Sequence, residues 1–116
     1  MDQKVTLGYW GIRGRGQIPR LLLAYTGAVW EDVKYTDPTQ WFGADKEKLG
    51  FEFPNLPYLI EGDYKLTETD AINRYIISRS NKKELIGQNP KDEGKVNMIM
   101  SVMNEVRMAI APMFMA

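Results

Sequence analysis

Residues 5–35 read VTLGYWGIRGRGQIPRLLLAYTGAVWEDVKY, and this stretch decides the fold. Residues 5–10 are β-rich and closed by a glycine, which predicts a short buried strand. From Gln17, apolar residues recur at spacings of three and four, which predicts a helix that stops before Gly27. A second strand is predicted over residues 29–35. A strand, a helix and a strand joined by short connections predict that the two strands pair in parallel.

The middle of the chain predicts a β-hairpin followed by a helix. Residues 58–61 and 64–67 are short strand-like runs about a glycine-aspartate turn. Hydroxyl and acidic residues at 67–70 precede a run with helical apolar spacing, which predicts the start of a helix. Before the hairpin, a short helical piece is predicted at 44–49. The order βαβ and then ββα predicts an α/β fold.

The end of the chain carries one more predicted helix. Residues 82–94 are polar and contain Gly87 and Pro90, as a linker does. The residues after them repeat an apolar pattern at helical spacing, in a stripe wider than one face: Val96, Met98, Ile99, Val102, Met103, Val106, Ala109, Ile110 and Met113. Such a helix must be buried by further helices, a second subunit or a larger assembly. The predicted organisation is a domain at 1–81, a linker at 82–90 and the first helix of a helical domain at 91–116.

Composition excludes several classes of function. Fifteen basic residues balance fifteen acidic ones, so no nucleic-acid partner is expected. The chain has no cysteine and no histidine, which excludes disulfides and thiolate ligands, and we expect no metal site. No apolar run is long enough for a membrane span, and the N-terminus lacks the pattern of a secretory signal. A cytoplasmic protein is therefore expected.

Three blocks of the sequence carry a resemblance to a known family. They read GYWGIRG and IPRLLL at 8–14 and 18–23, LGFEFPNLPYLI at 49–60, and LTETDAI at 66–72. In this order they resemble the opening, the glutathione-binding core and the next segment of a mu-type glutathione transferase. The resemblance implies a thioredoxin-like domain followed by the first helix of an all-α domain. It also implies glutathione as co-substrate, a small electrophile as its acceptor, and a homodimer or a larger assembly.

The resemblance implies a catalytic role for Tyr9, with Trp10 beside it in the glutathione site. A free thiol with a pKa of about 8.5 is only a few per cent thiolate near pH 7. In the family, a tyrosine at the end of the first strand donates a hydrogen bond to the glutathione sulfur, which favours the thiolate. Taken by itself, Tyr9 would be a strand aromatic with a satisfied hydroxyl.

Other residues correspond to those that hold the backbone and the γ-glutamyl end of glutathione in the family. Leu56 and Pro57 match its cis proline, whose flanking backbone pairs with the cysteinyl part. Without the resemblance a trans bond would be expected, because most X-Pro bonds are trans. Glu68 and Thr69 match the residues that bind the γ-glutamyl end, and they are equally suited to capping a helix.

For the glycyl carboxylate the resemblance implies Trp41 and Lys46, with Asn55 nearby. Compared with the family, one extra residue separates Trp41 from Lys46. Arg15 stands where the family commonly has leucine, and we expect it to add positive charge beside the thiolate, the alternative being a side chain that points outward. Glu105 corresponds to an acid that the family sends across a dimer interface to the glutathione amine.

Two functions remain open from the sequence. The first is a glutathione transferase that activates the thiol for conjugation. The second is a non-catalytic, transferase-like subunit recruited through the apolar last helix, where six of the seven methionines lie between Met98 and Met115. The lack of cysteine argues against a thiol-disulfide oxidoreductase of the same fold.

Overall fold

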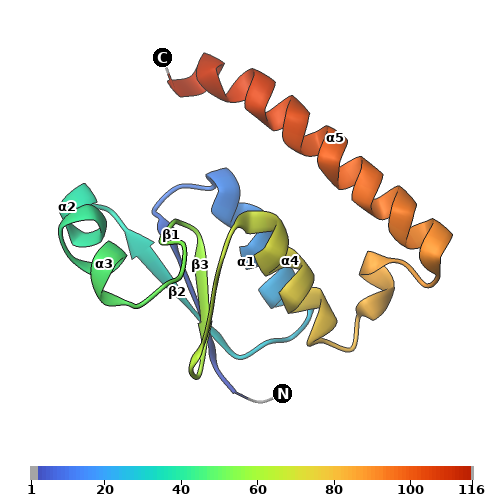
Figure 1. Cartoon of the computed structure of the whole chain (residues 1–116), viewed down its shortest axis with the longest axis horizontal. Helices are drawn as coiled ribbons and strands as arrows, with labels where there is room; N and C mark the ends of the chain where they lie inside the picture. Colours follow the sequence, from blue (N-terminus) through green and yellow to red (C-terminus); the bar gives the residue numbers. More distant parts are fainter. Residues whose placement is uncertain (1–2, 116) are drawn as a thin grey trace. The chain divides into compact units, whose positions relative to one another are not determined.

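The computed structural model describes residues 3–115 of the chain. The chain divides into two compact units, Met1–Lys82 and Lys83–Ala116. The first unit holds a β-sheet with its helices, and the second holds the last, long helix (Figure 1).

The first unit is built on a four-stranded mixed sheet in the order β2-β1-β3-β4. β1 pairs in parallel with β2 and antiparallel with β3, and β3 pairs antiparallel with β4. The bounds are β1 Val5–Trp10, β2 Trp30–Tyr35, β3 Tyr58–Glu61, β4 Tyr64–Thr67, α1 Gln17–Tyr25 and α4 Thr69–Ser78. The predicted α/β, thioredoxin-like order of βαβ and ββα is confirmed, and so is the parallel pairing of the first two strands.

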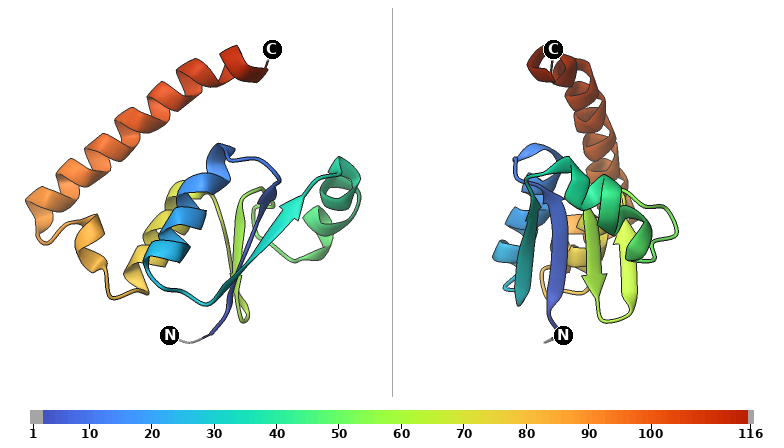
Figure 2. Two further views of the ribbon diagram at one scale, coloured as in Figure 1. Left: turned by 180° about the vertical axis from the view of Figure 1, so that it is seen from behind. Right: turned by 90° about the vertical axis from the view of Figure 1, so that its left-hand side faces the viewer.

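Helices α1 and α4 lie side by side on one face of the sheet (Figure 2). Pro19 stands in the first turn of α1, where no backbone N–H is needed, and Gly27 follows the helix with φ +74°. The side chains between these helices and the strands are fully buried: Val5, Leu7, Leu23, Leu59, Ile72 and Ile76. Burying each one stabilises the fold by about 1.5–3 kcal/mol, so this cluster is the main core.

A second, aromatic cluster lies where β1, β2 and β3 meet residues 38–48. Its buried members are Tyr9, Tyr35, Trp41, Leu56 and Tyr58. The Trp41 and Tyr58 rings are stacked with centroids 5.9 Å apart, and Trp41 meets Tyr35 edge-on at 5.6 Å. Such pairs add about 0.5–1.5 kcal/mol each to the effect of burial, so they fix residues 38–48 on the sheet.

Residues 38–48 form one helical segment, which includes most of the helical piece predicted at 44–49 and begins earlier than predicted. The segment runs through α2 Pro38–Gln40, the π turn η2 Trp41–Asp45 and α3 Lys46–Lys48. Its start carries the usual signals, because Pro38 stands at the first position and the Asp37 side chain accepts the Thr39 N–H at 3.0 Å. The π turn disturbs the helical spacing, which hid the segment in the sequence.

The second unit consists of the 3-10 turn η3 Lys83–Ile86 and the helix α5 Pro90–Met115. The predicted linker at 82–90 therefore contains a structured turn. Large apolar side chains on α5 are exposed, and the described residues of this unit form no buried cluster that would cover them. The exposed side chains are Met98, Ile99, Val102, Met103, Val106, Met108, Ile110 and Met113. Within residues 3–115, no helix is long and apolar enough to cross a membrane.

Candidate functional site

Tyr9 lies near the end of β1 with only 6% of its surface exposed. Its hydroxyl oxygen accepts the backbone N–H of Arg15 at 2.9 Å. Because this contact uses the oxygen as an acceptor, the phenolic O–H is still able to donate, and no residue in the described part of the chain accepts it. The fold therefore presents a hydrogen-bond donor for a ligand at this point.

The 3-10 turn η1 Gly14–Gly16 packs closely on the Tyr9 ring, and its two glycines make this possible. A Cβ on Gly14 would lie 2.5 Å from the Tyr9 hydroxyl oxygen, and a Cβ on Gly16 would lie 2.5 Å from ring atom Cδ2. Gly14 also has a φ of +37°, a backbone conformation that glycine adopts more easily than any other residue. The glycine spacing alone predicts a turn here, whereas the contact with Tyr9 is visible only in the fold.

The peptide bond between Leu56 and Pro57 is cis, as predicted. Both residues are buried ahead of β3, and Leu56 belongs to the same cluster as Tyr9. The Leu56 N–H donates to the Asn55 side-chain oxygen at 2.9 Å, and Asn55 Nδ2 donates to Glu68 Oε2 at 3.0 Å. Asn55 therefore links the cis bond to the start of α4.

Glu68 immediately precedes α4 and has φ +76°; among the described residues, it is the one non-glycine with a positive φ. Such backbone costs about 1–3 kcal/mol and is found most often at functional sites. Its side chain makes no capping bond to α4 and instead accepts from Asn55, so it is not an ordinary cap. Thr69 begins α4 and is half-buried. The carboxylate and the first amides of α4 together suit a group that carries both an ammonium and a carboxylate.

Trp10 follows Tyr9 at the end of β1, and Arg15 lies in the turn η1 that packs on the Tyr9 ring. The half-buried Trp10 ring lies 5.8 Å from the Phe42 ring and meets Tyr35 edge-on at 6.4 Å. Arg15 is exposed, and its backbone makes the contact with Tyr9. The effect of the Arg15 charge on a bound thiolate stays a prediction.

Trp41 and Lys46 stand at the two ends of the π turn, because the Lys46 N–H donates to the Trp41 carbonyl oxygen. A π turn holds one residue more than an α turn, so it accommodates the extra residue between them. Trp41 is 2% exposed and its ring belongs to the core. Lys46 Nζ lies 5.4 Å from the centroid of the exposed Phe42 ring. Contact of either residue with a glycyl carboxylate stays a prediction.

Two buried tyrosines anchor the π turn on the sheet. The Tyr35 hydroxyl donates to Asp45 Oδ2 at 2.6 Å and lies 2.9 Å from the Tyr58 hydroxyl. Burial, reinforced by the hydrogen bond to Asp45, raises the pKa of Tyr35 far above its usual value, and burial also raises the pKa of Tyr58. Both hydroxyls therefore keep their protons. Tyr35 holds Asp45, the residue before Lys46, and Tyr58 is bonded to Tyr35. No local motif in the sequence indicates this anchor.

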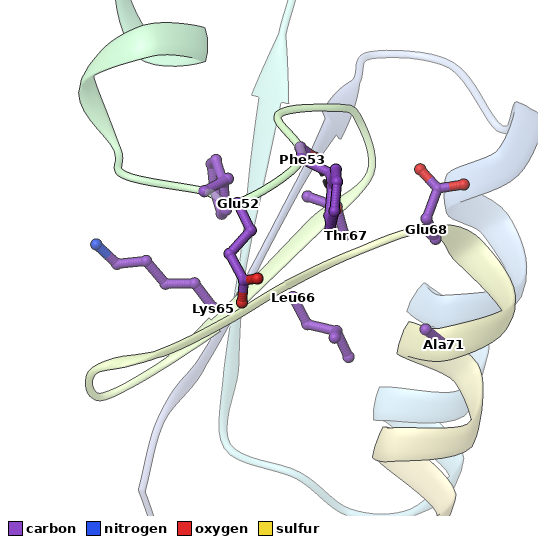
Figure 3. Close-up of a pocket in the computed structure, with 8 residues that line it drawn as sticks. Glu52, Phe53, Lys65, Leu66, Thr67, Glu68 and Ala71 are labelled. Carbon is purple, nitrogen blue, oxygen red and sulfur yellow. Dashed lines mark hydrogen bonds between the residues drawn. The ribbon is translucent and has the colours of Figure 1, made fainter.

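A pocket of about 230 Å³ lies beside the start of α4 (Figure 3). It is lined by Phe51, Glu52, Phe53, Lys65, Leu66, Thr67, Glu68 and Ala71. In Figure 3, the Glu68 carboxylate and the Lys65 side chain lie at opposite ends of the row of lining residues. Glu68 is the one lining residue that was also predicted for the site, so the pocket borders the site and does not contain Tyr9.

The remaining predicted residue, Glu105, lies on α5 in the second unit and is exposed. Its contact with the amine of glutathione stays a prediction. Across residues 3–115, no group of three or more acidic, histidine or cysteine side chains could hold a metal ion.

The sheet order, the cis proline ahead of β3 and the tyrosine near the end of β1 define a thioredoxin-like domain. Residues 5–78 match the family model described as the N-terminal domain of glutathione S-transferase. The chain therefore belongs to the glutathione S-transferase family.

Known relatives agree with this membership. "Glutathione S-transferase 2" of Gallus gallus and "Glutathione S-transferase Mu 2" of Macaca fascicularis are each 43% identical over 114 residues, covering 92% of this chain and 50% of theirs. The crystal structure of a major nematode-specific GST of C. elegans is similar with a TM-score of 0.82 at 29% identity, covering 97% of this chain and 52% of that one. The resemblance to mu-type transferases is confirmed, and the chain spans about half the length of these relatives.

Proposed function

We propose that the first unit binds glutathione and lowers the pKa of its thiol, as part of a transferase that attaches the sulfur to small electrophiles. One observation carries the proposal. The Tyr9 oxygen is held by the Arg15 N–H, its proton is available to a ligand, and Tyr9 shares a buried cluster with the residue before the cis proline. Family membership supports the same conclusion.

The residues present fit the parts of the tripeptide. Glu68 offers a carboxylate to the γ-glutamyl ammonium, and the start of α4 at Thr69 offers backbone donors to its carboxylate. The backbone at Leu56 lies between Asn55 and the cis bond, where it suits the cysteinyl part. Lys46 offers the cation that a glycyl carboxylate requires. We propose these contacts as the glutathione site.

The proposed chemistry needs no protein nucleophile. A hydrogen bond from the Tyr9 hydroxyl to the sulfur stabilises the thiolate more than the thiol, so the thiol loses its proton to solvent at a lower pH. The thiolate lone pair then forms the S–C bond. A leaving group departs with its electron pair, or the pair of an activated double bond moves away and takes up a proton. Alignment of the two reactants would supply the rest of the rate.

Tyr9→Phe tests the proposal, because it removes the donor and keeps the ring. Calorimetry is expected to give nearly the same Kd for glutathione. Turnover of an aryl halide near neutral pH is expected to fall about tenfold for each unit by which the thiol pKa rises. Tyr25→Phe is the matched control, since it removes the same oxygen from an exposed ring on α1. Absence of glutathione binding to the native protein would refute the proposal, and unchanged turnover in Tyr9→Phe would refute the role of Tyr9.

The exposed apolar face of α5 favours a second candidate, a non-catalytic subunit of a larger assembly. Glutathione binding without turnover, together with co-purification in a stoichiometric complex, would favour it over the enzyme.

For the enzyme we propose a homodimer, and the cytoplasm as its location, where the co-substrate is available. Sedimentation of the native protein separates a homodimer from a mixed complex.

A further inference from the structure

We infer that Arg20 is a positioning residue for Tyr9: it holds the backbone directly after Tyr9 in place and so fixes where the phenolic O–H points. The inference rests on the proposed function, and it adds a residue for which the sequence indicates no role.

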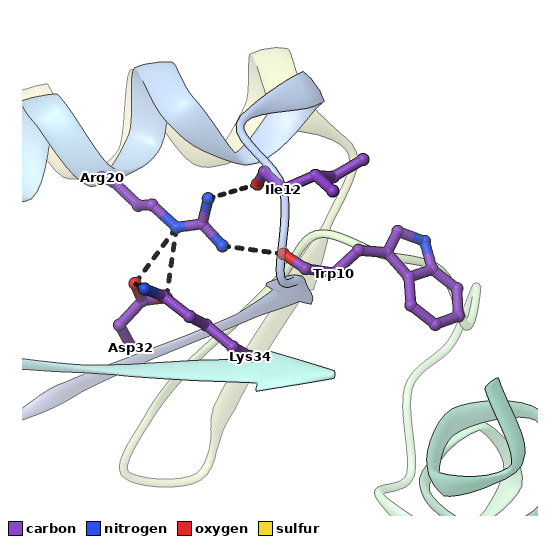
Figure 4. A network of polar contacts seen from close by, with 5 residues as sticks. All are labelled: Trp10, Ile12, Arg20, Asp32 and Lys34. Atoms are coloured by element: carbon purple, nitrogen blue, oxygen red, sulfur yellow. Dashed lines mark hydrogen bonds and ion pairs between the residues drawn. The ribbon is translucent and has the colours of Figure 1, made fainter. Parts of the chain in front are cut away.

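The first observation is that Arg20 binds two carbonyl groups, those of Trp10 and Ile12, in the chain that follows Tyr9. Arg20, in the first half of α1, donates from Nη2 to the Trp10 carbonyl oxygen at 3.0 Å and from Nη1 to the Ile12 carbonyl oxygen at 2.6 Å (Figure 4). Trp10 is the residue after Tyr9 and ends β1. The point at which the chain leaves the strand is therefore fixed from the helix.

The second observation is that the guanidinium is itself fixed. Its Nε lies 3.2 Å from the carboxylate of Asp32 on β2, and the two side chains are only 12% and 23% exposed. Asp32 pairs in register with Leu7 on β1. The position of the guanidinium is therefore fixed relative to the strand that carries Tyr9. All three guanidinium nitrogens are in use, in the planar fork that arginine provides and lysine does not.

The third observation concerns the Tyr9 ring. The guanidinium carbon of Arg20 lies 5.7 Å from the ring centroid, within the range of a cation–π contact. The ring also meets the turn at Gly14 and Gly16, and this turn leads directly into α1, which carries Arg20. The glycines that confine the ring and the arginine that binds the following backbone thus belong to one continuous helical stretch, residues 14–25.

A double-mutant cycle on the pKa of the bound glutathione thiol tests the inference. The thiolate absorbance is titrated in the native protein and in the variants Arg20→Met, Tyr9→Phe and Arg20→Met/Tyr9→Phe. If Arg20 acts through Tyr9, Arg20→Met alone raises the thiol pKa by about one unit, which is about tenfold less thiolate below the pKa. In the Tyr9→Phe background the same change has no further effect, because the O–H it would misplace is gone.

Two more variants complete the experiment. Lys34→Met removes an exposed charge 4.0 Å from the same Asp32 carboxylate but touches neither carbonyl, and the thiol pKa is expected to stay the same. Arg20→Lys keeps the charge beside Asp32 and loses the fork, so it is expected to raise the thiol pKa and serves in the cycle if Arg20→Met does not fold.

The outcomes are distinct. A rise in the thiol pKa that disappears in the Tyr9→Phe background supports the inference. A rise of equal size in both backgrounds overturns it, as does an unchanged pKa in Arg20→Met and Arg20→Lys while Tyr9→Phe raises it. If Tyr9→Phe itself leaves the pKa unchanged, the proposed role of Tyr9 fails and the inference fails with it, whereas the proposed function as a whole fails if the native protein binds no glutathione.

Discussion

At the scale of single residues, the site depends on what surrounds Tyr9. Its ring is buried against a turn whose glycines leave room for no Cβ, and its oxygen is fixed by a backbone N–H. A phenol held in this way loses little entropy when it meets a ligand, which is what preorganised donors contribute to catalysis.

Gly16→Ala tests this packing. The new Cβ would lie 2.5 Å from Cδ2 of the buried Tyr9 ring, so the ring or the turn must shift. We expect the free energy of unfolding to fall by about 1–3 kcal/mol and the pKa of the bound thiol to rise. Chemical denaturation and titration of the thiolate absorbance measure the two effects.

Gly43→Ala is the matched control for this change. A Cβ on Gly43 meets only Thr39 Cβ at 3.9 Å, an ordinary contact, and the residue lies in a helical segment. It is expected to be neutral or to stabilise by up to about 1 kcal/mol, and to leave the thiol pKa unchanged. Equal effects of the two substitutions would contradict the account of the Tyr9 environment.

At the scale of elements, the π turn shows how a local insertion is absorbed. Residues 38–48 stay helical because the turn takes up the extra residue and because Tyr35, itself bonded to Tyr58, holds Asp45 from the sheet. Lys46 lies in the connection between β2 and β3, and its position depends on Tyr35 and Tyr58 in these two strands.

Asp45→Ala tests this anchor. The buried Tyr35 hydroxyl would keep only Tyr58 as a partner, so we expect a loss of about 1–3 kcal/mol in the free energy of unfolding. Glutathione affinity, measured by calorimetry, is expected to weaken because Lys46 is less well placed. Glu47→Ala, an exposed acid two residues along, should change neither quantity. Equal affinities for Asp45→Ala and the native protein would contradict the link to Lys46.

A second element-scale contact ties β3 to α4. The Glu61 carboxylate accepts from the Tyr75 hydroxyl at 2.6 Å and from Arg79 Nη2 at 2.9 Å, and both charged side chains are at most 10% exposed. Burial alone would raise the pKa of Glu61, but the bonds from Tyr75 and Arg79 and the guanidinium charge lower it overall. Burial and the bond to Glu61 raise the pKa of Tyr75 to about 12.

The depressed pKa of Glu61 predicts an acid-sensitive fold. Its contribution to the free energy of unfolding is complete above the ordinary carboxyl pKa of 4.5 and is lost as the pH falls through the lower folded pKa. We expect Glu61→Gln to be less stable near pH 7 by about 1–3 kcal/mol and to lose less stability on acidification. Urea denaturation between neutral pH and pH about 3 measures both effects.

Glu31→Gln is the control for this substitution, since its partner Lys4 lies 2.9 Å away on the surface with both side chains more than half exposed. An exposed pair contributes about 0–1 kcal/mol, so little change is expected at any pH. If Glu61→Gln and Glu31→Gln showed the same dependence on pH, the network would not have the role given to it here.

At the scale of the whole molecule, the features that the sequence predicted were those encoded by residues close together in the chain. β1, β3 and β4 were predicted with their observed bounds and α1 with its observed start, because their apolar spacing and their turns are encoded within the elements. The partners that build the site are far apart in the chain, such as Arg20 with Asp32 and Asn55 with Glu68. They meet only through strand register and helix packing, which no local pattern reveals.

The division into two units gives a prediction at this scale. Residues 1–82 contain both buried clusters and every described strand, so we expect a chain ending at Lys82 to fold alone. A domain of this size has a stability of only a few kcal/mol. Amide hydrogen exchange should show protected N–H groups in β1 and β3 of this chain, as in the 116-residue chain. Unprotected strands in the shorter chain would show that the first unit depends on the second.

The central claim is that the phenol of Tyr9 meets the thiol of glutathione beside the cis bond at Pro57. A crystal structure of the native protein with glutathione measures this directly. The account predicts the sulfur within hydrogen-bond distance of the Tyr9 hydroxyl oxygen, with the cysteinyl backbone against Leu56. A tripeptide bound elsewhere, or with its sulfur turned away from Tyr9, would contradict it.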